Sequence, residues 1–234
     1  MKIFKISCIA LVCGAMLFAE TGCSSMTNTG RGALIGGGAG AAVGAGVGAL
    51  IGGGRGAAIG AAVGTGVGAG AGALIGNKMD RQQRELEAQL AQQATVEETK
   101  DANGLRAIKV TFEGGILFAT GKSDLSAQAK ADLSKFATSL INNPDTDVNI
   151  YGFTDNTGSY EANERVSNAR AKSVMSYIAN CGVSAARLHA QGVPMSEYVA
   201  TNETAEGRAQ NRRVEIYITA NENMIQQAEA GTLK

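Results

Sequence analysis

Asp155 and Arg170 are the two side chains in this sequence whose types and spacing suggest ligand-binding chemistry. A carboxylate binds an ammonium group, and an arginine guanidinium binds a carboxylate through two parallel hydrogen bonds. A ligand that carries both groups on one carbon is a free amino-acid head. The pair is therefore a candidate site for such a ligand. The alternative is a surface ion pair, which would contribute only about 0–1 kcal/mol to stability.

The residues around this pair predict a strand, a tight turn and a helix. Apolar residues alternate with polar ones immediately before Asp155, as in a half-buried strand. Residues 155–158 read Asp-Asn-Thr-Gly, which favours a turn. Ser159 is the expected N-cap of the following helix, and Gly182 its expected end. Arg170 then lies about three turns into the helix, so both charges can face one cleft.

This stretch resembles the OmpA-like peptidoglycan-binding domain. That family's signature is roughly Gly-His-Thr-Asp, a short loop, and Asn-x-x-Leu-Ser-x-x-Arg-Ala. The matching positions here are Gly152, Thr154, Asp155, Asn163, Val166, Ser167, Arg170 and Ala171. Phe153 stands where His is common, and Val166 where Leu is usual. The resemblance implies that Asp155 and Arg170 bind diaminopimelate, the amino acid of peptidoglycan stem peptides that has a free amino-acid head.

Two further segments resemble the family's ligand site. Phe118-Ala119 stands where Phe-Asp is usual, so one acidic side chain is missing there. Residues 207–215 match the closing motif, in which an arginine borders the pocket, and we favour Arg212 over Arg213 for that role. The alternative is that these arginines are only solvent-exposed charges at the start of a strand. The expected peptidoglycan-binding residues are Asp155, Arg170, Thr154, Asn163, Phe118 and Arg212.

The amino-terminal residues 1–22 are typical of a lipoprotein signal peptide. Two lysines precede an apolar run that is too short to span a membrane. Gly22 and Cys23 then resemble a lipoprotein cleavage site, although Glu20 stands where Leu is usual. We expect lipidation of Cys23, whose acyl chains would hold the protein at the outer membrane. The alternative is ordinary signal cleavage with an unmodified Cys23. Cys181 is expected to be a packed thiol without a disulfide.

Glycine recurs at every fourth residue from Gly32 to Gly76. Small residues four apart let helix backbones approach closely in lipid, and the stretch resembles the glycine-zipper segments of outer-membrane lipoproteins. Charged residues bracket two uncharged runs, each near the length that spans a bilayer. We therefore expect a helical hairpin, residues 33–53 and 56–76, embedded in or against the membrane, with self-association through its glycines. The alternative is a flexible spacer.

The predicted fold class is α+β. A β-α-β-α-β domain, with a mixed sheet and helices on one face, follows the glycine-zipper hairpin. Within it we expect a short pairing segment at 116–118, a helix over 126–141 and a last strand over 214–219. Residues 81–100 predict a polar helix. The expected boundaries are a signal peptide (1–22), a tether (23–31), a glycine-zipper segment (32–78), a polar helical linker (79–104), the OmpA-like domain (105–220) and a tail (221–234).

Composition and motifs favour a non-catalytic role. Acidic and basic residues are equal in number, which argues against a nucleic-acid partner. His189 is the single histidine, no nucleophile or metal-ligand motif is present, and we expect neither metal nor cofactor. The predicted function is to anchor the outer membrane to peptidoglycan, with the carboxyl-terminal domain in the periplasm. The alternative is an assembly or chaperone-like factor that acts through its glycine zipper.

Overall fold

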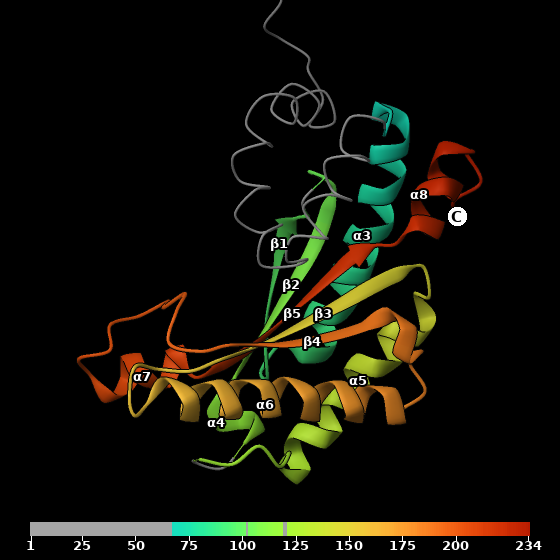
Figure 1. The fold of residues 1–234 in the computed structure, drawn as a ribbon. Coiled ribbons are helices and arrows are strands. Elements are labelled where there is room, and N and C mark those ends of the chain that lie inside the picture. The colour runs from blue at the N-terminus through green and yellow to red at the C-terminus, as the bar shows by residue number, and fades with distance from the viewer. Residues whose placement is uncertain (1–66, 102, 119–120) are drawn as a thin grey trace, which may run out of the picture.

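The computed structural model describes residues 67–234 except 102 and 119–120 (Figure 1). The expected signal peptide, the lipidation site Cys23 and most of the glycine segment lie outside the described residues. The elements are α3 (Ala69–Leu90), β1 (Thr95–Lys100), β2 (Arg106–Glu113), α4 (Gly114–Leu117), α5 (Ala127–Asn142), β3 (Thr146–Phe153), α6 (Tyr160–Asn180), a 3-10 turn (Ala185–Arg187), β4 (Leu188–Val193), α7 (Ala205–Asn211), β5 (Arg213–Ala220) and α8 (Glu222–Glu229).

The five strands form one mixed sheet in the order β1-β2-β5-β3-β4 (Figure 1). Strands β3 and β4 are parallel, and every other neighbouring pair is antiparallel. The parallel pair needs a crossover, and α6 supplies it. This arrangement confirms the predicted α+β class with a mixed sheet.

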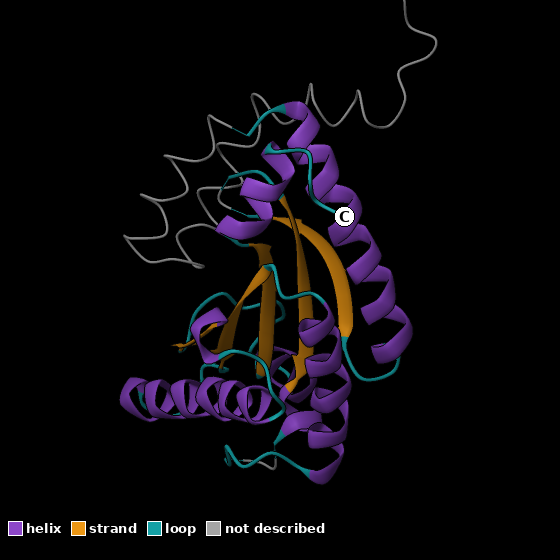
Figure 2. Ribbon diagram, turned by 90° about the vertical axis from the view of Figure 1, so that its right-hand side faces the viewer, coloured by secondary structure: helices purple, strands orange, loops and turns teal. Residues whose placement is uncertain are grey.

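The core lies between one face of the sheet and the helices α3, α5 and α6. Alternation along the strands places one set of apolar side chains on this face, including Ile108, Ile150 and Ile216, each fully buried. Phe112 from β2 meets Phe136 from α5 edge to face, with ring centroids 6.3 Å apart. Figure 2 shows α3 running alongside the strands, so the helix before the sheet belongs to the same packed unit.

The predicted polar helix over 81–100 is wrong beyond Leu90. Residues Thr95–Lys100 form β1, an edge strand paired with β2. Ion pairs to lysine and arginine side chains of β2 hold it: Glu97 lies 2.7 Å from Lys109, and Glu98 lies 2.7 Å from Arg106. The charged composition that resembles a solvated helix is equally suited to an exposed edge strand.

The helix α3 crosses the boundary expected between the glycine segment and the linker without a break. Its buried positions recur every three or four residues and are Ala71, Ile75, Met79, Gln82, Leu86 and Leu90. This face packs on α5 and α8, so residues 69–76 are part of the domain rather than a free membrane helix. A Cβ built on Gly72 or Gly76 meets no atom within 4 Å, so these glycines face away from that packing.

The helices of residues 67–234 include no segment with both the length and the apolarity that a bilayer crossing needs.

The expected tail contains α8, whose Met224 and Ala228 are buried against the core. A fragment bounded at 105 and 220 would therefore lack α3, β1 and α8 and would expose their buried partners. The packed unit is longer at both ends than the expected OmpA-like domain.

The short pairing segment predicted at 116–118 is also wrong. Residues Gly114–Leu117 form the single helical turn α4, and only Phe118 makes a β-bridge, to Leu125. Gly114 permits this because its backbone lies against the Arg212 carbonyl, to which its N–H donates at 2.7 Å. Local sequence does not specify this turn, because its geometry depends on a carbonyl far along the chain.

Helix ends follow the sequence signals. Ser126 and Ser159 cap α5 and α6, each accepting a hydrogen bond from the backbone N–H three residues on. Gly182 has φ +106° just after α6. Cys181, beside it, packs partly buried against the core and forms no disulfide within the described residues.

Candidate ligand-binding cleft

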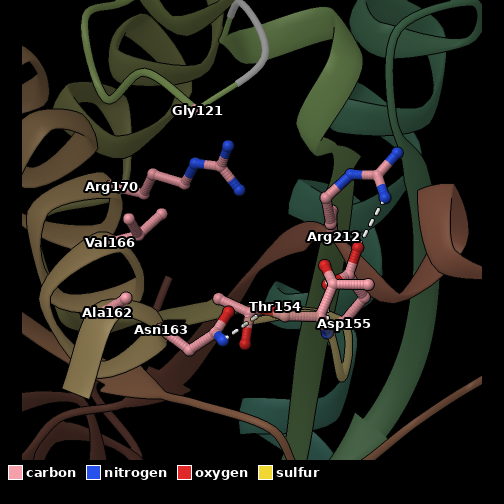
Figure 3. A pocket seen from close by; sticks show the side chains of 9 residues that line it. Gly121, Thr154, Asp155, Ala162, Asn163, Val166, Arg170 and Arg212 are labelled. Carbon is pink, nitrogen blue, oxygen red and sulfur yellow. Dashed lines mark hydrogen bonds and ion pairs between the residues drawn. The ribbon is translucent and has the colours of Figure 1, made fainter. Parts of the chain in front are cut away.

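A cleft of 370 Å³ opens where β3 ends and α6 begins (Figure 3). The turn after β3, the first half of α6, the residue after α7 and the loop after α4 form its walls. Its lining residues are Gly121, Thr154, Asp155, Thr157, Ala162, Asn163, Val166, Arg170 and Arg212. Three segments that are distant in sequence thus meet around one space: the strand–turn–helix unit of β3 and α6, the loop after α4, and the residue after α7.

Asp155 is held rigidly at the end of β3 and is 3% exposed. The backbone N–H of Thr157 donates to Oδ1 at 2.9 Å, and the Thr157 hydroxyl donates to the same oxygen. Arg212 Nη1 donates to Oδ2 at 2.6 Å. Burial alone would raise the pKa of the Asp155 carboxyl, but these hydrogen bonds outweigh it, and the pKa lies below its usual range. Asp155 is therefore a fixed negative charge at neutral pH.

Arg170 reaches the cleft from α6 and is 5% exposed. Its guanidinium carbon lies 5.2 Å from the centroid of the Phe118 ring, and Nε donates to the Lys122 carbonyl at 3.1 Å. The terminal Nη groups extend into the cleft (Figure 3). No carboxylate of the described residues forms an ion pair with them. Burial and the nearby Arg212 lower the pKa of Arg170, whereas Asp155 raises it, and the guanidinium remains charged.

Asp155 and Arg170 line the same cleft but do not form an ion pair with each other. The partner of Asp155 is Arg212, whose side chain is 40% exposed. Surface pairing of Asp155 with Arg170, the alternative raised by the sequence, is therefore wrong. The two terminal nitrogens of the Arg170 guanidinium are therefore available to donate hydrogen bonds to a ligand.

Of the two consecutive arginines, Arg212 faces the cleft and Arg213 does not. Arg213 is 4% exposed on the other face of the sheet, where Nε donates to Glu215 at 2.7 Å and Nη2 donates to the Glu197 carbonyl at 2.9 Å. Its guanidinium also stacks 3.9 Å above the Phe153 ring. Arg212 is the C-cap of α7 and Arg213 is the first residue of β5, and the bonds of Arg213 leave it no role in the cleft.

Thr154 and Asn163 position the backbone around the carboxylate. The Thr154 hydroxyl accepts a hydrogen bond from the Met195 N–H at 3.0 Å. Asn163 Nδ2 donates to the Thr157 carbonyl at 2.7 Å and to the Ser159 carbonyl at 3.0 Å, which closes the turn onto the helix. Phe118 lies beneath Arg170 and is not in the wall. These three predicted residues therefore support Asp155 and Arg170.

Two glycines let α6 lie directly on the sheet. A Cβ at Gly152 would overlap the Ser167 carbonyl oxygen, and one at Gly192 would lie 2.6 Å from the Asn168 nitrogen. The Gly192 N–H also donates to Asn168 Oδ1 at 2.9 Å. Gly152 thus holds the helix that carries Arg170 against β3, which leads into Asp155, and Gly192 holds it against β4. Sequence reasoning missed Gly192, because nothing local marks it as a contact site.

Sequence reasoning also missed the supporting roles of Thr157 and Gly121. The Asp-x-Thr spacing of the turn was a usable signal, since a side chain two residues on can donate back to the aspartate.

Among residues 67–234, apart from the three undescribed positions, no cluster of His, Cys, Asp or Glu could hold a metal ion. His189 is exposed on β4, away from the cleft lining.

The cleft contains one carboxylate and two guanidiniums. Asp155 has about four acceptor positions and uses three of them, so one remains for an ammonium group. The free fork of Arg170 suits a planar carboxylate. The net positive charge of the three groups favours a ligand with at least one negative charge. A zwitterionic amino-acid head meets all three conditions.

Comparison with known proteins defines the class. Residues 117–212 match the OmpA family, and residues 1–80 match the YMGG-like Gly-zipper family. The carboxyl-terminal part of the chain is thus an OmpA-family domain, and a glycine-zipper segment precedes it. The two family matches overlap nowhere, so each describes a different part of the chain.

Three known proteins illustrate the similarity. The "Probable lipoprotein YiaD" of Escherichia coli is 38% identical over 112 residues, which is 48% of this chain and 51% of YiaD. The peptidoglycan-binding protein ArfA of Mycobacterium tuberculosis is 38% identical over 112 residues, 48% of this chain and 34% of ArfA. The cell wall anchor of the T6SS from Pseudomonas aeruginosa superposes with a TM-score of 0.51 at 31% identity, covering 59% of this chain and 99% of that structure. The chain spans about a third to three fifths of the length of the curated relatives it matches.

Proposed function

We propose that this protein anchors the cell envelope by binding peptidoglycan non-covalently in the cleft between Asp155 and Arg170. The observation that carries the proposal is the pairing pattern: a fixed, ionised Asp155 and an Arg170 with a free fork line one cleft without pairing with each other. The names of ArfA and of the T6SS cell wall anchor support the same ligand class.

Within peptidoglycan, the chemistry of the cleft favours the free amino-acid head of diaminopimelate. Its ammonium group would use the remaining acceptor position of Asp155, and its carboxylate would receive two hydrogen bonds from Arg170. Arg212 holds Asp155 in place and adds a second positive charge near the carboxylate. Thr154 and Asn163 keep the turn in the geometry that this requires. No bond is made or broken, so the role is retention rather than catalysis.

The amino-terminal part would supply the second attachment. We propose that Cys23 is lipidated after removal of residues 1–22, and that the acyl chains hold the protein in the outer membrane with the OmpA-family domain in the periplasm. The glycine-zipper match and the similarity to the lipoprotein YiaD support this placement. Mass spectrometry of the amino-terminal peptide tests it, because an unmodified Cys23 or cleavage elsewhere would contradict lipid anchoring.

Sedimentation with purified sacculi tests wall binding. The full chain in detergent should sediment with diaminopimelate-containing sacculi, and free diaminopimelate should release it in a concentration-dependent way. Cadaverine, which has the same two ammonium groups at the same spacing but no carboxylate for Arg170, is the matched competitor and should release little. Because the pKa of Asp155 is lowered, retention should persist at about pH 5. No sedimentation, no release by diaminopimelate, or equal release by cadaverine would contradict the proposal.

A further inference from the structure

A second cleft, of 390 Å³, lies between α5 and α6. Its lining includes Lys130 from α5 and Lys172, Ser173 and Tyr177 from α6, together with Asp124 from the loop before α5. The site described above uses none of these residues. They are polar or charged, so a polar ligand suits the cleft better than an apolar one.

The two clefts follow one face of α6. Val166 and Arg170 line the first cleft, and Ser173 and Tyr177 line the second, at steps of three or four residues along the helix. The same loop also borders both, since Gly121 lines the first cleft and Asp124 the second. Between them the Lys122 carbonyl accepts the hydrogen bond from Arg170 Nε. The second cleft therefore begins where the first one ends.

The charges of the second cleft favour an anion. Lys130 and Lys172 approach it from facing helices, and neither ammonium group forms an ion pair with a carboxylate of the described residues. Asp124 is the single acidic residue of the lining, which leaves the cleft with net positive charge. The Tyr177 hydroxyl lies 2.9 Å from Ser134 Oγ, so this ring is held in place and can present its hydroxyl to a ligand.

We propose that the second cleft binds a further carboxylate of the same wall peptide whose amino-acid head occupies the first cleft. This inference rests on the proposed function. The step from Arg170 to Ser173 or Tyr177 corresponds to about 5–10 Å along the helix axis. A peptide advances at most about 3.3–3.6 Å per residue, so a carboxylate one to three residues from the head group reaches Lys130 and Lys172. The second cleft thus distinguishes a stem peptide from a free amino acid.

Isothermal titration of the full chain with two ligands tests this. The ligands are free lysine, which has one amino-acid head and no second carboxylate, and a peptidoglycan stem tetrapeptide that contains diaminopimelate. The wild type should bind the tetrapeptide more tightly. The Lys130→Gln/Lys172→Gln double variant should bind the tetrapeptide about 3–10-fold more weakly, because two exposed charges contribute modestly, and bind free lysine as the wild type does. Asp124→Asn should tighten tetrapeptide binding by about 2–3-fold.

The double variant Arg84→Gln/Lys234→Gln removes the same charge at exposed positions outside the cleft and should leave both affinities unchanged. Unchanged tetrapeptide binding by the Lys130/Lys172 variant would overturn the second subsite while leaving the proposed function intact. An equal loss for both ligands would also overturn it, since the effect would then be a general one. Failure of the wild type to bind either ligand would overturn the proposed function and the subsite together.

Discussion

Replacing Arg170 by alanine should abolish retention of the full chain by sacculi. The ligand carboxylate would lose its bidentate partner while still desolvated in the cleft, and truncation of one member of a buried charge pair costs about 2–5 kcal/mol of binding free energy. Asp155→Ala should have an effect of similar size, because the ligand ammonium would then face two guanidiniums with no carboxylate. Retention is measured by sedimentation, and the affinity for free diaminopimelate by titration calorimetry.

Two controls separate this effect from charge and folding. Arg165 is exposed on the same helix and is not part of the cleft lining, so Arg165→Ala should sediment like the wild type. Arg170→Lys keeps the positive charge but loses the fork and should recover only part of the affinity. Circular dichroism should show a folded domain for each variant. Retention of folded Arg170→Ala at the wild-type level would show that this residue is not part of the site.

Gly152→Ala should destabilise the domain and weaken wall binding at once. The added Cβ would overlap the Ser167 carbonyl, so α6 must shift away from β3 or the strand must distort. Steric overpacking of this kind costs about 1–3 kcal/mol of unfolding free energy, and more where backbone must move. The shift would also separate Arg170 from Asp155. Denaturant unfolding and sacculus sedimentation of the same preparation report the two effects.

The same substitution at Gly76 is the matched control. Its Cβ meets nothing within 4 Å in the middle of α3, so Gly76→Ala should stabilise the domain by up to about 1 kcal/mol and leave wall binding unchanged. If the same Gly→Ala substitution lowers the unfolding free energy at Gly152 and raises it at Gly76, the close contact with α6 is the reason that Gly152 does not tolerate a side chain. A stable, wall-binding Gly152→Ala variant would contradict the close approach of helix and strand.

The strand, turn and helix around Asp155 could be predicted because their signals are local. Ser159 and Gly182 mark the helix ends through bonds and torsions that involve only nearby residues. The charges of Asp155 and Arg170 could be recognised as a pair because both lie in this one unit. Their common cleft then follows from the path of a single strand–helix connection.

Other features depend on contacts between distant segments, and the sequence alone could not predict them. The polar residues of β1 become a strand only because β2 offers an unpaired edge. The bond from Arg212 to Asp155 joins residues from different ends of the domain. The burial of one face of α3 likewise depends on α8, which follows the last strand.

The long helix α3 also determines how the domain resists mechanical force. A load transmitted from the amino-terminal side enters at the start of α3, which is about 33 Å long. A pull along its axis would slide the helix past α5 and α8, and its buried side chains from Ala71 to Leu90 would have to leave their partners together. A pull across the axis would instead peel the helix off one turn at a time. A tether aligned with α3 therefore loads the domain in shear, the direction in which its packing is strongest.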